Sequence, residues 1–305
     1  MLSKPIYALT KDRSKKALVN NICGDPEEWF DFQTFKENNL FAASFDFFVD
    51  WKNKKICDEV WIKRISDSDN IQNLDEEELI KLISDCDGVE KSRRLYLFLR
   101  HQKIKEKYML FKDVPEESWK NGTGIVVELD LSKYKKGSIS RFNINEIQDK
   151  IKKLRKVPAP IGRSGLNYST SSLEGYLSKQ QFFWPGDVDM VLYDGNNNAV
   201  AIIEFKKHTA RSKITFEDQK ISNYLNKDIL KYKSLALLRN HFKTDLFVLY
   251  YPVPADINYI IIEKIEGAPD SLHAAGRYEL DLPVKNDINK MRTFADRFIS
   301  EVLKR

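Results

Sequence analysis

The most constraining feature of the sequence is an apolar run that ends in charged residues. Residues 199–205 read Ala-Val-Ala-Ile-Ile-Glu-Phe, and Lys206 follows. Such a run predicts a strand buried at the centre of a sheet. Side chains alternate along a strand, so Glu204 and Lys206 share one face, about 7 Å apart. A surface ion pair worth well under about 1 kcal/mol fits this position badly. Charge forced into a core indicates a functional role instead, because burying charge is costly.

A hairpin joins this strand to a second one that carries two aspartates. The turn is Asp194-Gly-Asn-Asn-Asn, and Pro185-Gly-Asp-Val-Asp opens the partner strand. Asp187 and Asp189 share a face that the hairpin brings beside Glu204. Carboxylates gathered at strand ends repel one another unless a cation neutralises them. Oxygen ligands without cysteine or clustered histidine suit Mg²⁺ or Mn²⁺. The position of Asp187 after Pro-Gly is also typical of a plain turn residue.

Together, Pro185-Gly-Asp-Val-Asp189 and Glu204-Phe-Lys206 resemble the signature of the PD-(D/E)xK nucleases, which have restriction-endonuclease-like folds. The resemblance covers roughly residues 171–252. It implies an α/β protein with an αβββαβ core in its C-terminal half.

The resemblance also assigns roles. Asp189, with Asp187 as runner-up, and Glu204 would hold the metal together with the Phe205 backbone carbonyl. Lys206 would orient or help to deprotonate the attacking water.

Two more residues are implied by the same family. Glu174 matches the extra glutamate of the first helix, although only twelve residues separate it from Asp187, so the first strand must be short, over 181–184. Glu146 on the preceding helix is the substitute, and Ser171-Ser-Leu-Glu174 also has capping-box spacing. In Phe216-Glu-Asp-Gln-Lys-Ile-Ser, Gln219 resembles the glutamine that some subfamilies, including the virus-type replication-repair nucleases, carry on the next helix.

Basic residues beyond the lysine suggest a nucleic-acid contact. Lys207, Lys213 and Lys220 would form a phosphate-binding rim, and His208 shares the Glu204 face and would contact a phosphate or support a ligand. The alternative is that the lysines lie on an ordinary solvated face and that His208 is strand-end surface.

The segment 156–172, Lys-Val-Pro-Ala-Pro-Ile-Gly-Arg-Ser-Gly-Leu-Asn-Tyr-Ser-Thr-Ser-Ser, predicts a domain boundary. Residues 1–156 would form a separate N-terminal α+β domain and residues 157–305 the nuclease domain. In the first domain we expect strands near 45–51, 60–65, 95–99, 108–111 and 125–131, and helices over 73–83 and 143–156. We find no internal repeat in the sequence, and no motif that assigns a role to the first domain.

Composition narrows the class further. The 305 residues are 42% hydrophobic and 31% charged, which suits a packed protein, and the net charge of +5 is compatible with nucleic acid. No apolar run reaches the length of about 18 residues that a membrane helix needs, and the N-terminus lacks a secretory apolar core. Three cysteines without metal or disulfide spacing predict a reducing, cytoplasmic location.

We therefore expect a Mg²⁺- or Mn²⁺-dependent nuclease acting on DNA, although nothing in the residues distinguishes DNA from RNA. By resemblance it would be a restriction, antiviral-defence or repair enzyme, and a homodimer if it cuts both strands. The N-terminal domain would choose the substrate, sense a small ligand or bind a protein regulator. The alternatives are a silent nucleic-acid-binding or assembly module of the same fold, and a nuclease gated through that domain.

Overall fold

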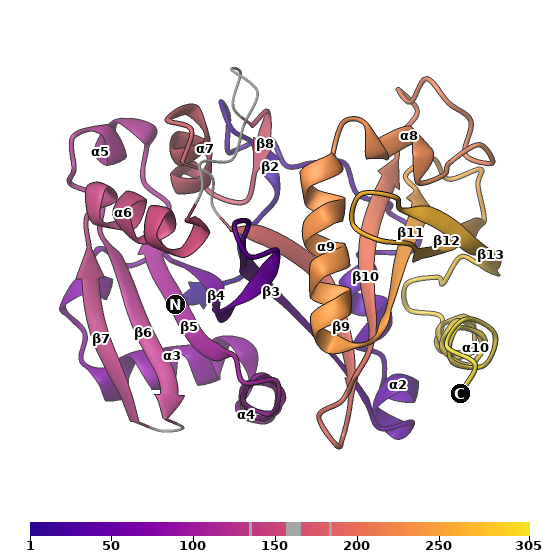
Figure 1. Cartoon of the computed structure of the whole chain (residues 1–305), viewed down its shortest axis with the longest axis horizontal. Coiled ribbons are helices and arrows are strands. Elements are labelled where there is room, and N and C mark those ends of the chain that lie inside the picture. The colour runs from indigo at the N-terminus through magenta and orange to yellow at the C-terminus, as the bar shows by residue number, and fades with distance from the viewer. Residues whose placement is uncertain (134–135, 157–165, 183–184) are drawn as a thin grey trace. The chain divides into compact units, whose positions relative to one another are not determined.

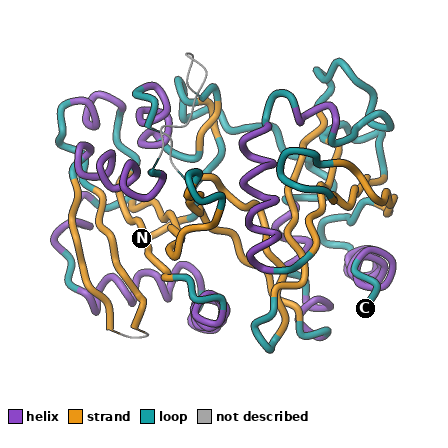
Figure 2. Tube along the Cα trace, viewed as in Figure 1, coloured by secondary structure: helices purple, strands orange, loops and turns teal. Residues whose placement is uncertain are grey.

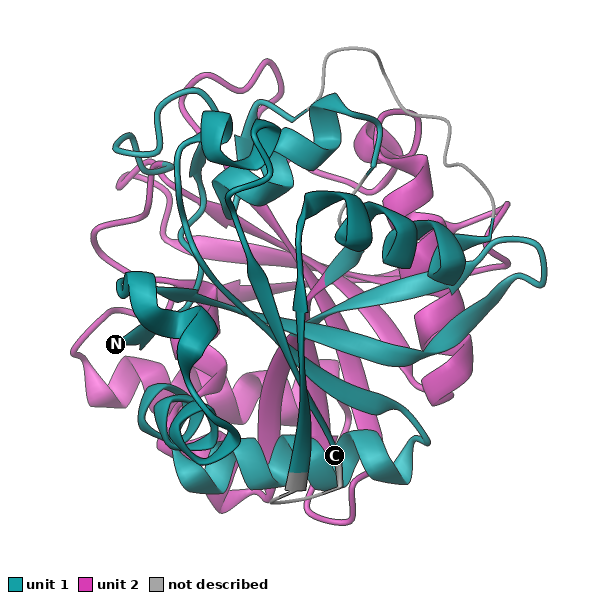
Figure 3. Ribbon diagram, turned by 90° about the vertical axis from the view of Figure 1, so that its left-hand side faces the viewer, with its two compact units in different colours: residues 1–17, 45–187 teal, residues 18–44, 188–305 magenta. Residues whose placement is uncertain are grey.

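The computed structural model describes residues 1–133, 136–156, 166–182 and 185–305. The chain is a mixed α/β protein of two compact units, with unit 1 formed by residues 1–17 and 45–187 and unit 2 by residues 18–44 and 188–305 (Figure 3). Both units combine helices with sheets (Figure 2). Among the residues named above, no helix is long and apolar enough to cross a membrane.

This division differs from the predicted boundary after residue 156. Most of the Pro/Gly segment, residues 157–165, lies outside the described residues. Residues 18–44 belong to unit 2 because Trp29, Phe30 and Phe35 are buried in its hydrophobic core. Each of these aromatic side chains removes a large apolar area from water, so this early segment is a structural part of unit 2.

The long strands of unit 1 lie in the sheet order β3-β4-β5-β6-β7 (Figure 1). Its pairs are antiparallel except β4 and β5, which are parallel and are connected through α3 and α4. The elements are β3 (Leu40–Asp50, in unit 1 from Phe45), β4 (Lys55–Ser66), η1 (Asp69–Asn73), α3 (Glu76–Asp87), α4 (Val89–His101), β5 (Lys105–Lys112), α5 (Glu116–Lys120), β6 (Val126–Lys133), β7 (Lys136–Phe142), α6 (Ile144–Arg155) and α7 (Ser172–Lys179). The short β1 (Leu2–Ser3) pairs with β4, and β2 (Ala8–Leu9) pairs with β8 (Tyr168–Ser169).

One strand predicted in unit 1 is wrong. Residues 95–99 lie within α4, where Leu95, Tyr96, Phe98 and Leu99 are buried. Their spacing follows the helical period and not the alternation of a strand, so all four face the core from one side of the helix. The helix predicted from residue 73 begins later, because Asp75 and Glu78 form the capping box of α3.

Unit 2 carries the sheet β9-β10-β11-β12-β13 (Figure 1). Again only one pair is parallel, β10 with β11, and α8 and α9 lie between these two strands in the chain. The elements are α1 (Pro26–Phe30), α2 (Gln33–Glu37), β9 (Gly186–Asp194, in unit 2 from Val188), β10 (Ala199–His208), α8 (Ser222–Leu225), α9 (Ile229–Phe242), β11 (Asp245–Pro252), β12 (Tyr259–Glu266), β13 (His273–Asp281), α10 (Ile288–Arg297) and the π-helical turn Phe298–Val302.

The predicted hairpin, buried strand, helix and further strand are therefore present in unit 2. The short first strand expected at 181–184 is not confirmed, because Gln181 and Phe182 are not in a strand and residues 183–184 lie outside the described part. Helix α9 packs on β10 and β11 (Figure 1). Ala201, Ile203 and Phe205 point the other way, into the core shared with α1, α2 and α10.

The two units repeat one order of elements. Each has an antiparallel strand pair, a helical crossover to a parallel neighbour, two further antiparallel strands and a closing helix. The crossover helices α4 and α9 are followed by Lys103 and Lys243, both in the left-handed conformation, and the next strand starts two residues later in each case. The fold thus contains an internal repeat that the residue types do not reveal.

Candidate active site

The candidate site forms where β9 and β10 separate in unit 2. Their described pairing ends at Ile203 and Met190, and the same register continues to Glu204 beside Asp189. There the Phe205 N–H donates to Asp189 Oδ2 at 2.7 Å. The N–H and C=O groups of one strand residue point to the same edge, so the Phe205 carbonyl faces the Asp189 side as the resemblance implied.

Glu204 is a buried carboxylate held by two ammonium groups. Its side chain is 1% exposed, and Oε1 lies 2.8 Å from Lys231 Nζ and 3.0 Å from Lys206 Nζ. Its Oε2 is buried and has no hydrogen-bond partner within the described residues, and neither has the buried Tyr232 hydroxyl. Leaving a buried carboxylate oxygen unpaired is costly, so Oε2, with no protein donor in the described part of the chain, is able to accept a further donor or a cation.

Lys231 was not found by sequence reasoning. It extends from the first turn of α9. Its Nζ lies 3.7 Å from Asp189 Oδ1 and 2.8 Å from Glu204 Oε1. A single positive charge therefore bridges the two carboxylates that the sequence singled out. No local pattern could have indicated this, because only the packing of α9 on β10 brings the residue there.

Lys206 is held as an ammonium ion. Its Nζ lies 3.2 Å from Asp228 Oδ2 and 5.3 Å from the ring centroids of both Tyr224 and Tyr232. Burial by itself would lower the pKa of Lys206, but the Glu204 and Asp228 carboxylates outweigh burial and raise it above its ordinary value. In this arrangement the lysine donates hydrogen bonds and does not accept a proton.

Gln219 and His208 form a buried polar pair behind Lys206. Gln219 precedes α8 and is not on a helix, and its Nε2 lies 2.9 Å from His208 Nδ1. Its Oε1 accepts a hydrogen bond from the hydroxyl of Tyr224, whose ring lies against Lys206. Burial lowers the pKa of His208, so a neutral imidazole completes this network. Both residues are positioned to support Lys206 through Tyr224.

Glu174 and Asp187 belong to unit 1. The Glu174 carboxylate accepts hydrogen bonds of 2.7 Å from the Thr170 N–H and from the Thr170 hydroxyl. The backbone N–H of Glu174 donates to the Ser171 hydroxyl. These contacts hold Glu174 at the start of α7, and its Oε2 also lies 3.8 Å from Lys63 Nζ within unit 1. The substitute Glu146 forms the capping box of α6 with Asn143.

Asp187 is exposed on β9. Burial opposes the charge of Lys63, but Asp46, Glu174 and Asp187 together raise its pKa above the ordinary value. Asp187 therefore acts electrostatically on a buried lysine of its own unit.

The three lysines expected to form a phosphate-binding rim do not lie in one place. Lys207 points to the face opposite Glu204, and its Nζ donates to the Leu18 carbonyl within unit 2. Burial lowers its pKa. Lys213 and Lys220 are themselves exposed in the segment before α8, where a polyanion can reach them.

The site offers a divalent cation a small number of oxygen donors. No group of three or more His, Cys, Asp or Glu side chains with metal-binding geometry occurs in the described ranges. The site instead offers two carboxylates, Asp189 and Glu204, and the Phe205 carbonyl. The Lys231 ammonium lies between the two carboxylates, so positive charge is already accommodated at this position. Glu204 Oε2 has no hydrogen-bond partner within the described residues. Oxygen donors of this kind suit Mg²⁺, which retains several waters of its own.

Unit 1 provides an internal comparison for this site. Tyr108 and Val248 are the fourth residues of β5 and β11, and they pair with Ile62 and Glu204. Ile62 is therefore the counterpart of Glu204, and two residues later Arg64 is the counterpart of Lys206. The register of β3 and β4 likewise makes Phe45 the counterpart of Asp189.

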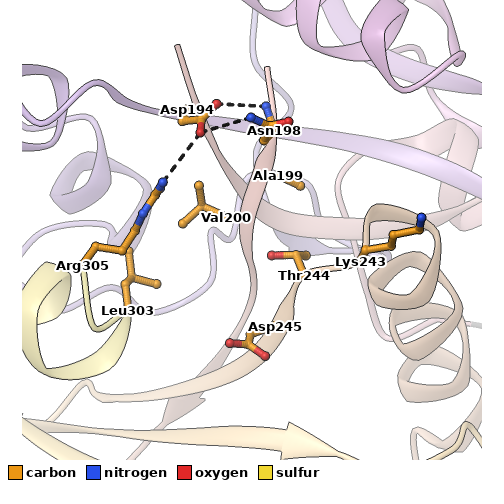
Figure 4. Close-up of a pocket in the computed structure, with 9 residues that line it drawn as sticks. All are labelled: Asp194, Asn198, Ala199, Val200, Lys243, Thr244, Asp245, Leu303 and Arg305. Carbon is orange, nitrogen blue, oxygen red and sulfur yellow. Dashed lines mark hydrogen bonds and ion pairs between the residues drawn. The ribbon is translucent and has the colours of Figure 1, made fainter. Parts of the chain in front are cut away.

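Unit 2 also has a surface pocket that contains none of the predicted residues (Figure 4). It lies at the hairpin end of β10, where Asp194 accepts hydrogen bonds from Asn198 and pairs with Arg305 at 3.7 Å. These contacts fix the turn and the C-terminus, so the pocket has a structural explanation.

Comparison of the chain with known protein families, curated proteins and solved structures found no match.

Proposed function

We propose that unit 2 is a metal-dependent nuclease centre that hydrolyses phosphodiester bonds, most readily in DNA. The observation that carries the proposal is that Glu204 is a buried carboxylate beside Asp189, at two positions where the same arrangement of strands in unit 1 has apolar residues. At the counterpart positions unit 1 uses Phe45 and Ile62, both buried. The same order of strands is thus compatible with apolar residues there, and the charges of unit 2 call for a functional explanation.

In this proposal Asp189, Glu204 and the Phe205 carbonyl would hold Mg²⁺ or Mn²⁺. The bound metal would stabilise the charge that develops on the phosphoryl group. Lys206, as an ammonium ion, would hold the attacking water or a phosphate oxygen through a hydrogen bond. Asp228 and the rings of Tyr224 and Tyr232 would keep its side chain in position.

Several features support the biological setting that we propose. Cys23, Cys57 and Cys86 are free thiols, which is compatible with the reducing cytoplasm that we propose. The net charge of +5 is compatible with a polyanionic substrate. A restriction, defence or repair role rests on the sequence resemblance alone.

The test is cleavage of supercoiled, linear and single-stranded DNA, and of RNA, by the full chain in Mg²⁺ or Mn²⁺. Asp189→Asn and Glu204→Gln are expected to abolish both calorimetric metal binding and turnover. Lys206→Met should keep metal binding but cut the rate by about 10²- to 10³-fold, the effect of losing one hydrogen-bond donor to the transition state. The control Lys264→Met removes a lysine from β12 of the same unit and should cleave at the wild-type rate.

Turnover by Glu204→Gln at the wild-type rate would refute the proposal. Metal binding by the wild type without cleavage of any substrate would instead favour a silent binding module of the same fold.

A further inference from the structure

Lys231 occupies the position where the proposed metal has to bind. Its Nζ lies 2.8 Å from Glu204 Oε1 and 3.7 Å from Asp189 Oδ1, the same two carboxylates assigned as ligands. The side chain is 27% exposed and starts in the first turn of α9, so its flexible stem has solvent on one side. It is able to leave without unfolding the helix.

The two lysines of the site are anchored differently. Lys206 contacts Asp228 and lies over two tyrosine rings in addition to Glu204. The ion pairs of Lys231 described above go to the metal-ligand carboxylates themselves. A divalent cation at those carboxylates repels a neighbouring ammonium group, and Lys231 is the ammonium that shares both ligands with it.

We propose that Lys231 is a built-in counter-ion that competes with the metal. In the metal-free chain it neutralises Asp189 and the buried Glu204, which would otherwise repel each other. Metal binding displaces it, so part of the metal's affinity is lost to breaking these ion pairs. The inference rests on the proposed function, because it places the metal on the same carboxylates.

The experiment measures Mn²⁺ binding by calorimetry, and thermal unfolding in EDTA and in Mn²⁺, on the full chain. Lys231→Met keeps most of the side chain and removes the charge. We expect it to bind Mn²⁺ at least about tenfold more tightly than the wild type, the effect of removing one competing ion pair. It should also melt at a lower temperature in EDTA and gain more from Mn²⁺ than the wild type does.

Two further variants make the result specific. Lys231→Arg keeps the positive charge and should restore the wild-type melting temperature in EDTA. Lys264→Met also loses two ion pairs, but to the half-exposed carboxylates of Asp245 and Glu266, so it should bind Mn²⁺ as the wild type does and change the melting temperature little. In a Glu204→Gln background the loss of melting temperature caused by Lys231→Met should largely disappear, because the charge to be neutralised is gone.

The outcomes separate this inference from the proposed function. If the wild type binds Mn²⁺ and Lys231→Met binds it equally or more weakly, the competition is refuted while the metal centre stands. If neither binds Mn²⁺, the metal centre and the competition both fail. A lower melting temperature of Lys231→Met in EDTA would then still support its counter-ion role, and an unchanged one would refute that role too.

Discussion

Glu106 allows a quantitative prediction, because its environment fixes both the sign and the size of a pH effect. It is the second residue of β5 in unit 1, it is 2% exposed, and neither carboxylate oxygen has a hydrogen-bond partner in the described part of the chain. Burial, with a smaller contribution from the negative charge of Asp87, raises the pKa of Glu106 to about 8 from an ordinary value of 4.5. The folded protein therefore holds this carboxyl protonated at neutral pH.

The stability consequence follows from the proton that the unfolded chain releases. Below pH 4.5 the carboxyl is protonated in both the folded and the unfolded chain, so its ionisation does not change the free energy of unfolding. As pH rises from 4.5 towards 8, only the unfolded chain loses the proton, so the free energy of unfolding falls by about 1.4 kcal/mol per pH unit. At pH 7 the accumulated loss is about 3 kcal/mol, and above about pH 8 it stays constant.

Glu106→Leu removes the titrating group, and the repeat itself suggests leucine, because Leu246 is the second residue of β11. Urea unfolding of both proteins from pH 4.5 to 8 should show the stability of the variant relative to wild type rising by about 3 kcal/mol between pH 4.5 and 7. Glu106→Gln, which keeps the shape and polarity, should show the same dependence on pH. Parallel stability profiles for wild type and both variants would refute the reasoning.

Two further predictions concern the units. Deleting residues 1–156 removes Trp29, Phe30 and Phe35 from the core of unit 2. Each buried aromatic side chain lost costs several kcal/mol, so the fragment should show no cooperative unfolding transition by circular dichroism. A cooperative transition in the fragment would contradict this account. Because unit 1 has apolar residues at the counterpart positions, each chain should cut one strand per encounter. Open circles should then accumulate before linear DNA in gel assays of supercoiled plasmid, and linear product appearing first from dilute protein would count against a single centre.

The part of the site that lies on two neighbouring strands could be predicted from the sequence. A hairpin turn and strict alternation fix which side chains share a face, so Asp189, Glu204 and Lys206 were found without tertiary information. Lys231 and Asp228 escaped because they depend on how α9 packs on the sheet. Gln219 was placed on a helix by family resemblance, yet the chain forms a turn there.

The fold was predictable to a similar depth. Strands rich in apolar residues were identified, but residues 95–99 are equally apolar and form a helix. An unbroken apolar run of five residues fits both periods, and only the structure shows that Leu97 is the exposed one. The repeat was invisible because the two units share topology while their buried residues differ, as Ile62 and Glu204 illustrate. Residues 18–44 belong to unit 2 through contacts with residues 188–305, which lie far along the chain. No local sequence pattern encodes such contacts.

The segment 18–44 also has a consequence for biosynthesis. It leaves the ribosome long before residues 188–305, the remainder of the unit in which it is buried. During that interval Trp29, Phe30 and Phe35 have no completed core to enter, whereas the residues of unit 1 are already available to one another. The nascent chain therefore carries an aromatic cluster without its core until translation is nearly finished, and exposed apolar surface of this kind is prone to aggregation.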